Sequence, residues 1–300
     1  MTDIETRTLA ASGADLTYDI HGDLHRHESI PLLMVGSPME ATGFGTLAQY
    51  FTDRPVVTYD PRGIARSTRN DGTTSGTPEE HADDIHRIIE ALATGPVDIF
   101  ASSGGAVNAL ALVARHGELV RTLVAHEPPT AQFLPDRDRV LAVSTDITAT
   151  YQEAGLGPAM AKFITLISHR GELTAEYTDR PAPDPAQFGL PATDDGSRDD
   201  PMVGPHLLSC CGYEYDLAAL AASPTRIVLG TGRASAGELC ARAAIALAAA
   251  LDSEAVAFPG GHAGFLGGEF GMTGEPEAFA AVLREVLADP SKPGPNGSTV

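Results

Sequence analysis

The chain has 300 residues, 43% of them hydrophobic, and a formal net charge of −20. This size and composition allow a large buried core and exclude an intrinsically disordered protein. The 40 acidic against 20 basic residues, with Lys162 and Lys292 as the only lysines, argue against partners such as nucleic acid or an anionic membrane surface, because both select clustered basic side chains.

The first part of the chain alternates strand patterns with helical patterns. Alternating polar and apolar residues around Ser12-Gly13 predict an edge hairpin, and uninterrupted apolar runs predict buried parallel strands. The strands are expected at residues 6–11, 15–20, 31–36, 55–59, 97–101 and 120–125. Helices are expected at residues 42–51, 78–93 and 104–116, the second beginning at the N-cap signal Thr77-Pro78-Glu79-Glu80.

The alternation stops at Glu127-Pro128-Pro129 and resumes near residue 225. The intervening segment predicts helices at residues 138–153, 158–168 and 205–211, with an exposed loop over residues 177–204 rich in Pro, Asp and Gly. After it, strands are expected at residues 225–230 and 255–258 and helices at residues 237–251 and 275–288.

These elements predict an α/β protein with a mostly parallel, eight-stranded sheet flanked by helices. Residues 1–129 and 223–290 would form the core domain. Residues 130–222 would form a helical cap inserted into it, and residues 291–300 a flexible tail.

Residues 97–110 carry the pattern of a nucleophile elbow, in which a strand turns sharply into a helix at one strained residue. The turn closes only if the residues two before and two after the nucleophile are small. Ala101 and Gly105 meet this condition for Ser103, whereas Phe100 violates it for Ser102. Ser103 is therefore the candidate nucleophile, and a structural strand-to-helix turn is the alternative.

An activated serine needs a general base and backbone donors for an oxyanion. His262 follows the last predicted strand on a glycine-rich loop, at the sheet edge where the elbow is expected, and is the candidate base. The Gly104 N–H at a helix N-terminus and the Ser37 N–H after the strand 31–36 are the candidate oxyanion donors. We expect Pro38 and Met39 of the same loop to contact substrate.

The group that orients the histidine is less obvious. The loop 230–235 after the penultimate core strand, the usual place for the acid, contains neither Asp nor Glu. Glu127 leaves a buried strand at its carboxyl end and is the favoured acid, because a carboxylate there needs a partner and His262 would supply one. Glu238, near the start of the next helix, and a dyad without any acid are the alternatives.

The remaining residues predict no cofactor and no metal. Cys210, Cys211 and Cys240 lack the spacing of a metal site and are expected to be buried free thiols. The N-terminal residues lack an apolar signal sequence, which predicts a soluble, cytoplasmic protein. The oligomeric state is open, with a homodimer as one possibility.

Together these motifs resemble the α/β-hydrolase fold superfamily over about residues 9–288. Residues 101–105 (ASSGG) resemble its G-x-S-x-G elbow, and residues 36–38 (GSP) its H-G-x-P oxyanion loop. Residues 60–67 (DPRGIARS) resemble its D-x-R-G-x-G-x-S turn, and Gly261-His262 with Phe265 its histidine loop. The sequence H-E-P-P is similar to the H-E-x-P stretch of zearalenone-type lactone hydrolases, in which the Glu is the triad acid.

The departures from the family pattern are Ala101 for the first elbow glycine, Val35 for the usual histidine, Ala65 for a turn glycine, and the empty acid position. A serine nucleophile argues against the haloalkane dehalogenase and epoxide hydrolase branches, which use Asp.

The resemblance implies a serine hydrolase acting on a small-molecule ester or lactone. The cap would supply an apolar pocket, with candidate lining residues Met160, Phe163, Phe188 and Leu207. A non-hydrolytic relative with haloperoxidase-like or lyase chemistry, and a non-catalytic ligand receptor on the same fold, are the alternatives.

Overall fold

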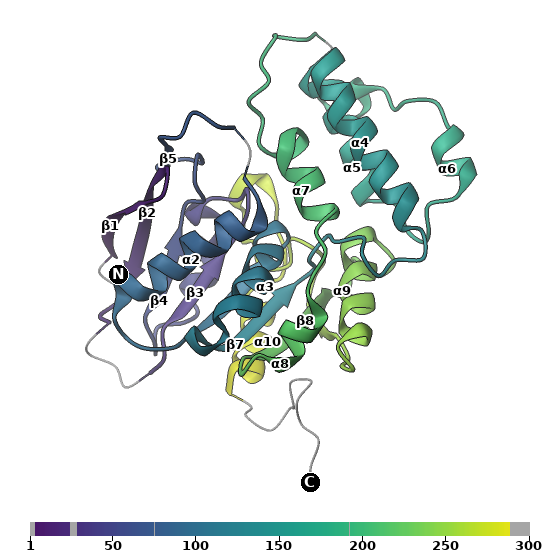
Figure 1. Cartoon of the computed structure of the whole chain (residues 1–300). Coiled ribbons are helices and arrows are strands. Elements are labelled where there is room, and N and C mark those ends of the chain that lie inside the picture. The colour runs from purple at the N-terminus through teal and green to yellow at the C-terminus, as the bar shows by residue number, and fades with distance from the viewer. Residues whose placement is uncertain (1–3, 25–28, 75, 192, 289–300) are drawn as a thin grey trace.

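Eight strands lie in one sheet in the order β1-β2-β4-β3-β6-β7-β8-β9 in the computed structural model, which describes residues 4–24, 29–74, 76–191 and 193–288 (Figure 1). The strands are β1 (Ile4–Ala11), β2 (Ala14–His21), β3 (Leu32–Val35), β4 (Val56–Tyr59), β6 (Val97–Ser102), β7 (Val120–His126), β8 (Arg226–Gly232) and β9 (Val256–Phe258). A two-residue strand, β5 (Thr68–Arg69), pairs with β2. The predicted mostly parallel sheet flanked by helices is confirmed.

The strand directions explain the two sequence patterns. β1 pairs antiparallel with β2, and β2 pairs antiparallel with β4, whereas the pairs from β4 to β9 are parallel. The parallel strands β3, β4 and β6 are buried along their whole length, which is why they read as continuous apolar runs. All carboxyl ends of the parallel strands consequently meet at one edge of the sheet.

Helices cover both faces of the sheet and form a separate group beyond its edge. The helices are α1 (Gly45–Ala48), α2 (Pro78–Leu92), α3 (Gly104–His116), α4 (Arg137–Ala154), α5 (Leu156–Ile167), α6 (Ala175–Asp179), α7 (Leu207–Cys211), α8 (Leu217–Ala222), α9 (Leu239–Ala250) and α10 (Pro276–Ala288). The shorter turns are η1 (Ala41–Phe44), η2 (Gly117–Leu119), η3 (Pro185–Phe188), η4 (Met202–His206) and η5 (Glu269–Gly271).

Side chains from successive positions of β6 enter two different cores. Ile99 packs in the cluster that contains α2 and α3, whereas Phe100 packs in the cluster that contains α1 and α10. This alternation follows from the pleat of the strand, which points neighbouring side chains to opposite faces. The sheet is therefore covered by α2 and α3 on one face and by α1 and α10 on the other.

The helices between β7 and β8 have a largely separate core. Val140, Ile147 and Tyr151 of α4 pack with Leu166 of α5 and Leu207 of α7 in a third cluster. Figure 1 shows α4, α5 and α6 displaced to one end of the sheet. α8 differs, because its Leu220 packs in the cluster of α2 and α3. The division into a core and a cap at residues 130 and 222 stays a prediction.

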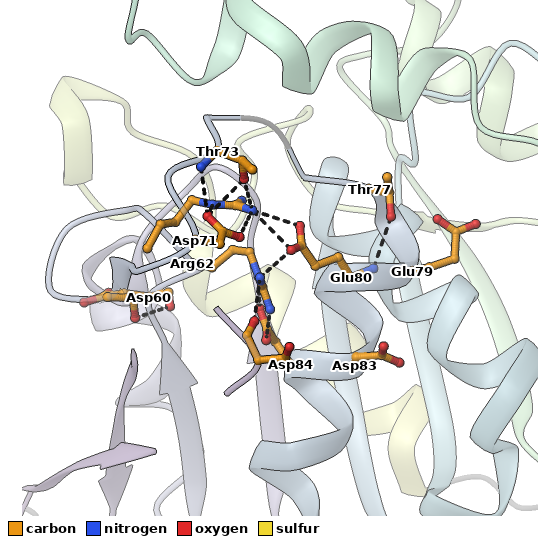
Figure 2. Close-up of polar contacts among 12 residues, drawn as sticks. Asp60, Arg62, Asp71, Thr73, Thr77, Glu79, Glu80, Asp83 and Asp84 are labelled. Atoms are coloured by element: carbon orange, nitrogen blue, oxygen red, sulfur yellow. Dashed lines mark hydrogen bonds and ion pairs between the residues drawn. The ribbon is translucent and has the colours of Figure 1, made fainter. Parts of the chain in front are cut away.

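Arg62 joins the turn after β4 to α2, and its guanidinium is almost completely buried (Figure 2). Its Nε donates to Asp84 Oδ2 at 2.6 Å, and its Nη1 pairs with Glu80 Oε1 at 2.5 Å. The predicted start of α2 is confirmed, since the Thr77 hydroxyl accepts the Glu80 N–H at 3.2 Å. This joint fixes α2 against the loops at the carboxyl edge of the sheet.

Local differences from the sequence-based elements have physical reasons. Residues 42–51 form η1 and the single turn α1 in place of one continuous helix, since Gly43 and Gly45 lower the helix propensity of this segment. The expected loop 177–204 includes η3 and the end of α6. The expected tail 291–300 lies outside the described residues. No helix in the described parts of the chain is long and apolar enough to cross a membrane.

Candidate active site

Ser103 lies where β6 turns into α3 and has the strained backbone of an elbow. Its φ of 56° is in the left-handed region, which costs energy for a residue other than glycine. The start of α3 packs closely against β3, because a Cβ on Gly105 would lie 2.3 Å from the carbonyl oxygen of Val35. Ser102 is the last residue of β6 and is buried. The backbone thus singles out Ser103 as the serine at the strained position.

His262 lies in the loop after β9 and faces a carboxylate from a neighbouring strand. Its Nδ1 is 2.6 Å from Glu127 Oε2, within hydrogen-bonding distance. The imidazole is partly exposed, whereas the Glu127 side chain is completely buried. This contact orients the ring with Nδ1 toward Glu127. Nε2 is then the ring nitrogen that can accept a proton from another group.

The Glu127 carboxylate accepts hydrogen bonds from residues 230–235, the segment that contains no Asp or Glu. Its Oε1 accepts the Gly232 N–H at 2.8 Å and also the Ser235 hydroxyl. Its φ of 50° turns the chain sharply as it leaves β7, and its N–H donates to the Gly230 carbonyl at 3.0 Å. The last residue of β8 and the loop after it therefore supply donors to a carboxylate from the adjacent strand, a role that no sequence motif indicated.

The charge of Glu127 follows from these contacts. Burial on its own would raise the pKa of this carboxyl, but the hydrogen bond from His262 and the neighbouring groups outweigh burial and hold the pKa below its ordinary value. Glu127 is consequently ionised at neutral pH and can stabilise a positive imidazolium on His262.

Glu238 has different partners. It is the residue before α9, and its Oε1 accepts from Arg170 Nη2 at 3.2 Å. Among the described residues, the carboxylate hydrogen-bonded to His262 is that of Glu127. Of the two sequence candidates for the acid, the structure thus brings Glu127 to the histidine.

One cavity of about 430 Å³ contains the candidate residues from both the sheet edge and the helices beyond it. Ser103, Gly104, Ser37 and His262 line it from the core. The segments between β7 and β8 add apolar side chains that include Phe163, Ile164, Ile167, Met202 and Leu207. The site is therefore an apolar cavity with few polar groups, which is typical of a small-molecule pocket.

Not every predicted lining residue faces this cavity. Met160 packs with the third core cluster, and Phe188 is an exposed side chain. Pro38 lines a neighbouring cavity of about 460 Å³, which shares Ser37 and His206 with the apolar one. Met39 packs against Gly36 and Gly43 beneath the loop.

The two residues that carry the candidate oxyanion donors, Gly104 and Ser37, both line the apolar cavity. Gly104 is the first residue of α3, where backbone N–H groups have no acceptor within the helix. Ser37 is in the loop after β3, and its buried hydroxyl has no hydrogen-bond partner among the described residues.

His126 is a buried histidine next to Glu127 that sequence reasoning did not single out. Its ring is surrounded by Phe258, Phe265 and Phe279, and neither ring nitrogen has a hydrogen-bond partner among the described residues. Burial lowers its pKa to about 4, so the ring is neutral at physiological pH. It lies 6.3 Å from the His262 ring, centroid to centroid.

The three cysteines are free and buried, as predicted, and all of them line the apolar cavity. Burial raises the pKa of each thiol, so the thiols are protonated. No group of three His, Cys, Asp or Glu side chains in the described ranges could hold a metal ion.

The sequence of this chain is similar to those of known proteins. A family model described as the alpha/beta hydrolase fold matches residues 41–219. The uncharacterized hydrolase YraK of Bacillus subtilis (strain 168) is 29% identical over 269 residues, which are 87% of this chain and 91% of that protein.

Solved structures share the fold over nearly the whole chain. The enol-lactonase from Burkholderia xenovorans LB400 matches with a TM-score of 0.62 at 15% identity, over 94% of this chain and 100% of its own. A thermophilic esterase from Thermogutta terrifontis matches with a TM-score of 0.62 at 18% identity, over 94% of this chain and 98% of its own. At these identities the likeness shows the fold alone. Because the family model covers more than half of the sequence, the chain belongs to the α/β-hydrolase family.

Proposed function

We propose that this protein is a serine hydrolase that cleaves a carboxylic ester or a lactone through an acyl-enzyme intermediate. The observation that carries the proposal is the 2.6 Å contact between His262 Nδ1 and the buried Glu127 carboxylate, in a cavity that Ser103 also lines. A buried, ionised carboxylate on an imidazole beside a strained serine is the arrangement that activates a hydroxyl nucleophile.

Acylation begins with attack of Ser103 Oγ on the substrate carbonyl carbon, while His262 Nε2 takes the hydroxyl proton. Glu127 holds the imidazole in the required tautomer and stabilises the imidazolium. His262 then gives the proton to the leaving alkoxide oxygen, and the carbon–oxygen bond of the ester breaks. In a lactone the released hydroxyl stays attached to the acyl group.

Deacylation repeats these steps with water as the nucleophile. His262 removes a proton from water, the hydroxide attacks the acyl carbon, and the proton returns to Ser103 Oγ. In both half-reactions the carbonyl oxygen becomes negative, and the N–H groups of Gly104 and Ser37 would stabilise it. The positive end of α3 adds to this stabilisation.

The cavity supports a substrate with an apolar group next to the scissile carbonyl. Its lining is predominantly apolar, and its volume of about 430 Å³ suits a small organic molecule. The protonated thiols on its wall add polarisable surface without charge. The fold is shared with an enol-lactonase and an esterase, which agrees with this substrate class.

Turnover of a panel of lactones, nitrophenyl acyl esters and thioesters tests the proposal. The wild type should hydrolyse at least one class, Ser103→Ala should abolish turnover, and Ser102→Ala, the matched control one residue away, should retain it. Stoichiometric labelling of Ser103 by a fluorophosphonate without turnover of any ester would instead indicate a ligand receptor. Absence of labelling would contradict an activated serine and leave non-hydrolytic chemistry as the better account.

A further inference from the structure

His206 joins the helical segment between β7 and β8 to the loop that follows β3. It is the last residue of η4, and its Nε2 lies 3.0 Å from the carbonyl oxygen of Ser37. A carbonyl oxygen only accepts hydrogen bonds, so Nε2 must carry the proton. The hydrogen bond thus runs from the cap side of the cavity to the core side.

His206 is a neutral imidazole, and its one ring proton is on Nε2. Burial lowers the pKa of the ring to about 4, so the imidazole is neutral at physiological pH and Nδ1 carries no proton. Cys210 Sγ lies 3.4 Å from Nε2, but burial raises the pKa of this thiol. The two side chains therefore do not form a thiolate–imidazolium pair, and His206 is not the base of a second nucleophile.

The hydrogen bond lies directly against the first residue of α3. A Cβ on Gly104 would come within 2.4 Å of His206 Nε2 and 2.5 Å of the Ser37 carbonyl oxygen. Gly104 and Ser37, whose N–H groups are the proposed oxyanion donors, are thus both in close proximity to the hydrogen bond between His206 and the Ser37 carbonyl. His206 also lines both the apolar cavity and the neighbouring cavity that contains Pro38.

We propose that His206 is a positioning residue that fixes the oxyanion loop. Its Nε2–H holds the Ser37 carbonyl and thereby limits rotation of the Ser37 backbone, so that the Ser37 N–H stays directed toward the same point as the Gly104 N–H. The helical segment between β7 and β8 then both lines the cavity and holds the loop that carries one of the oxyanion donors. This inference rests on the proposed function, because it assigns a role within the same hydrolytic site.

The test compares substitutions that remove or keep the donor. His206→Phe keeps a ring but removes the N–H, whereas His206→Gln keeps an N–H donor with similar reach. Ser209→Ala is the matched control, because the Ser209 hydroxyl, three residues further along, makes another contact to the core by donating to the Gly76 carbonyl at 3.1 Å. Each variant is measured for kcat and KM on the best nitrophenyl ester, with circular dichroism to verify folding.

A donor role predicts that His206→Phe lowers kcat by roughly 10- to 100-fold with little change in KM, because a displaced oxyanion donor weakens transition-state binding. His206→Gln should recover most of the activity, and Ser209→Ala should keep the wild-type kcat. Should His206→Phe fail to fold, His206→Asn replaces it, since its shorter amide cannot reach Ser37 and should lower kcat equally.

Three results would overturn the role of His206 alone. These are an unchanged kcat in the folded donor-free variant, an equal loss in Ser209→Ala, and a failure of His206→Gln to recover activity. In each case Ser103-dependent turnover by the wild type would leave the proposed function standing. Absence of that turnover in the wild type would overturn the proposed function and the role of His206 with it.

Discussion

Glu127 occupies a position in which an isolated carboxylate would be strongly destabilised. It is completely buried and has a positive φ, yet its two oxygens contact His262, the Gly232 N–H and the Ser235 hydroxyl. Burying a charge is tolerated only when it is paired and hydrogen-bonded. The surroundings of Glu127 are therefore built for an ionised group that faces the histidine.

Replacing this carboxylate separates the two candidate acids. Glu127→Gln should lower kcat by roughly 10³- to 10⁴-fold, because an amide of similar shape cannot stabilise the imidazolium. Glu238→Gln should stay close to the wild type, since Glu238 contacts Arg170 at 3.2 Å. Steady-state kinetics on one ester decide the matter, and a large loss in Glu238→Gln alone would contradict the assignment.

Motifs predicted some members of the site and could not predict others. The elbow residues Ala101 and Gly105 select Ser103 locally, and the glycine-rich loop selects His262. Ser235 and Gly232 escaped prediction because their contact with Glu127 depends on the pairing of β7 with β8, in which His126 lies opposite Gly230. A contact set by strand register leaves no local pattern in the sequence.

Among the elements, α2 is positioned by charges as well as by its apolar face. The Arg62 guanidinium and the Asp84 carboxylate are both buried, and they are joined at 2.6 Å (Figure 2). One residue earlier, Asp83 forms a half-exposed pair with Arg115 at 3.0 Å. Neighbouring carboxylates on one helix thus allow the same substitution to be compared in two environments.

Asp84→Asn should destabilise the fold by roughly 3 kcal/mol, because it removes the buried carboxylate from the buried Arg62 guanidinium and leaves the partly exposed Glu80 as its charged partner. Asp83→Asn should cost less than about 1 kcal/mol, as expected for a solvent-exposed ion pair. Urea unfolding of both variants measures the two values. Similar midpoints for the two variants would contradict the view that this joint stabilises the arrangement of α2 and the β4 turn.

The elements that were predictable are those with a long, uniform pattern. Buried parallel strands read as apolar runs, and α2 has both a cap and an apolar face, with Thr77 at its N-cap. β5 has two residues and η1 has four, which is too short for a period to emerge. Their conformations depend on neighbouring elements, so the sequence alone did not reveal them.

At the scale of the whole molecule, three histidines within the described ranges are buried and neutral, and they link its stability to pH. Burial lowers the pKa of His81 to about 3 and the pKa values of His126 and His206 to about 4. In the unfolded chain the pKa of each imidazole is about 6.5, so these rings bind protons once the pH falls below that value. Their contribution to stability is therefore fully present above pH 6.5 and is lost as the pH falls toward 4.

His126→Phe tests this linkage, because phenylalanine suits the aromatic surroundings of the ring and cannot bind a proton. The wild-type free energy of unfolding should fall between pH 7 and pH 4, and the variant should lose on the order of 3 kcal/mol less over the same interval. Urea unfolding at both pH values gives the comparison. An equal fall in the two proteins would mean that His126 does not contribute to acid lability.

In the proposed reaction, Ser103 carries the acyl group during turnover. A direct test traps the acyl-enzyme. The enzyme is mixed with a nitrophenyl ester, quenched with acid during the first turnovers, and its peptides are mapped by mass spectrometry. We predict an acyl adduct on Ser103, present in Ser102→Ala and absent in Ser103→Ala. An adduct on another side chain, or rapid turnover by Ser103→Ala, would contradict it.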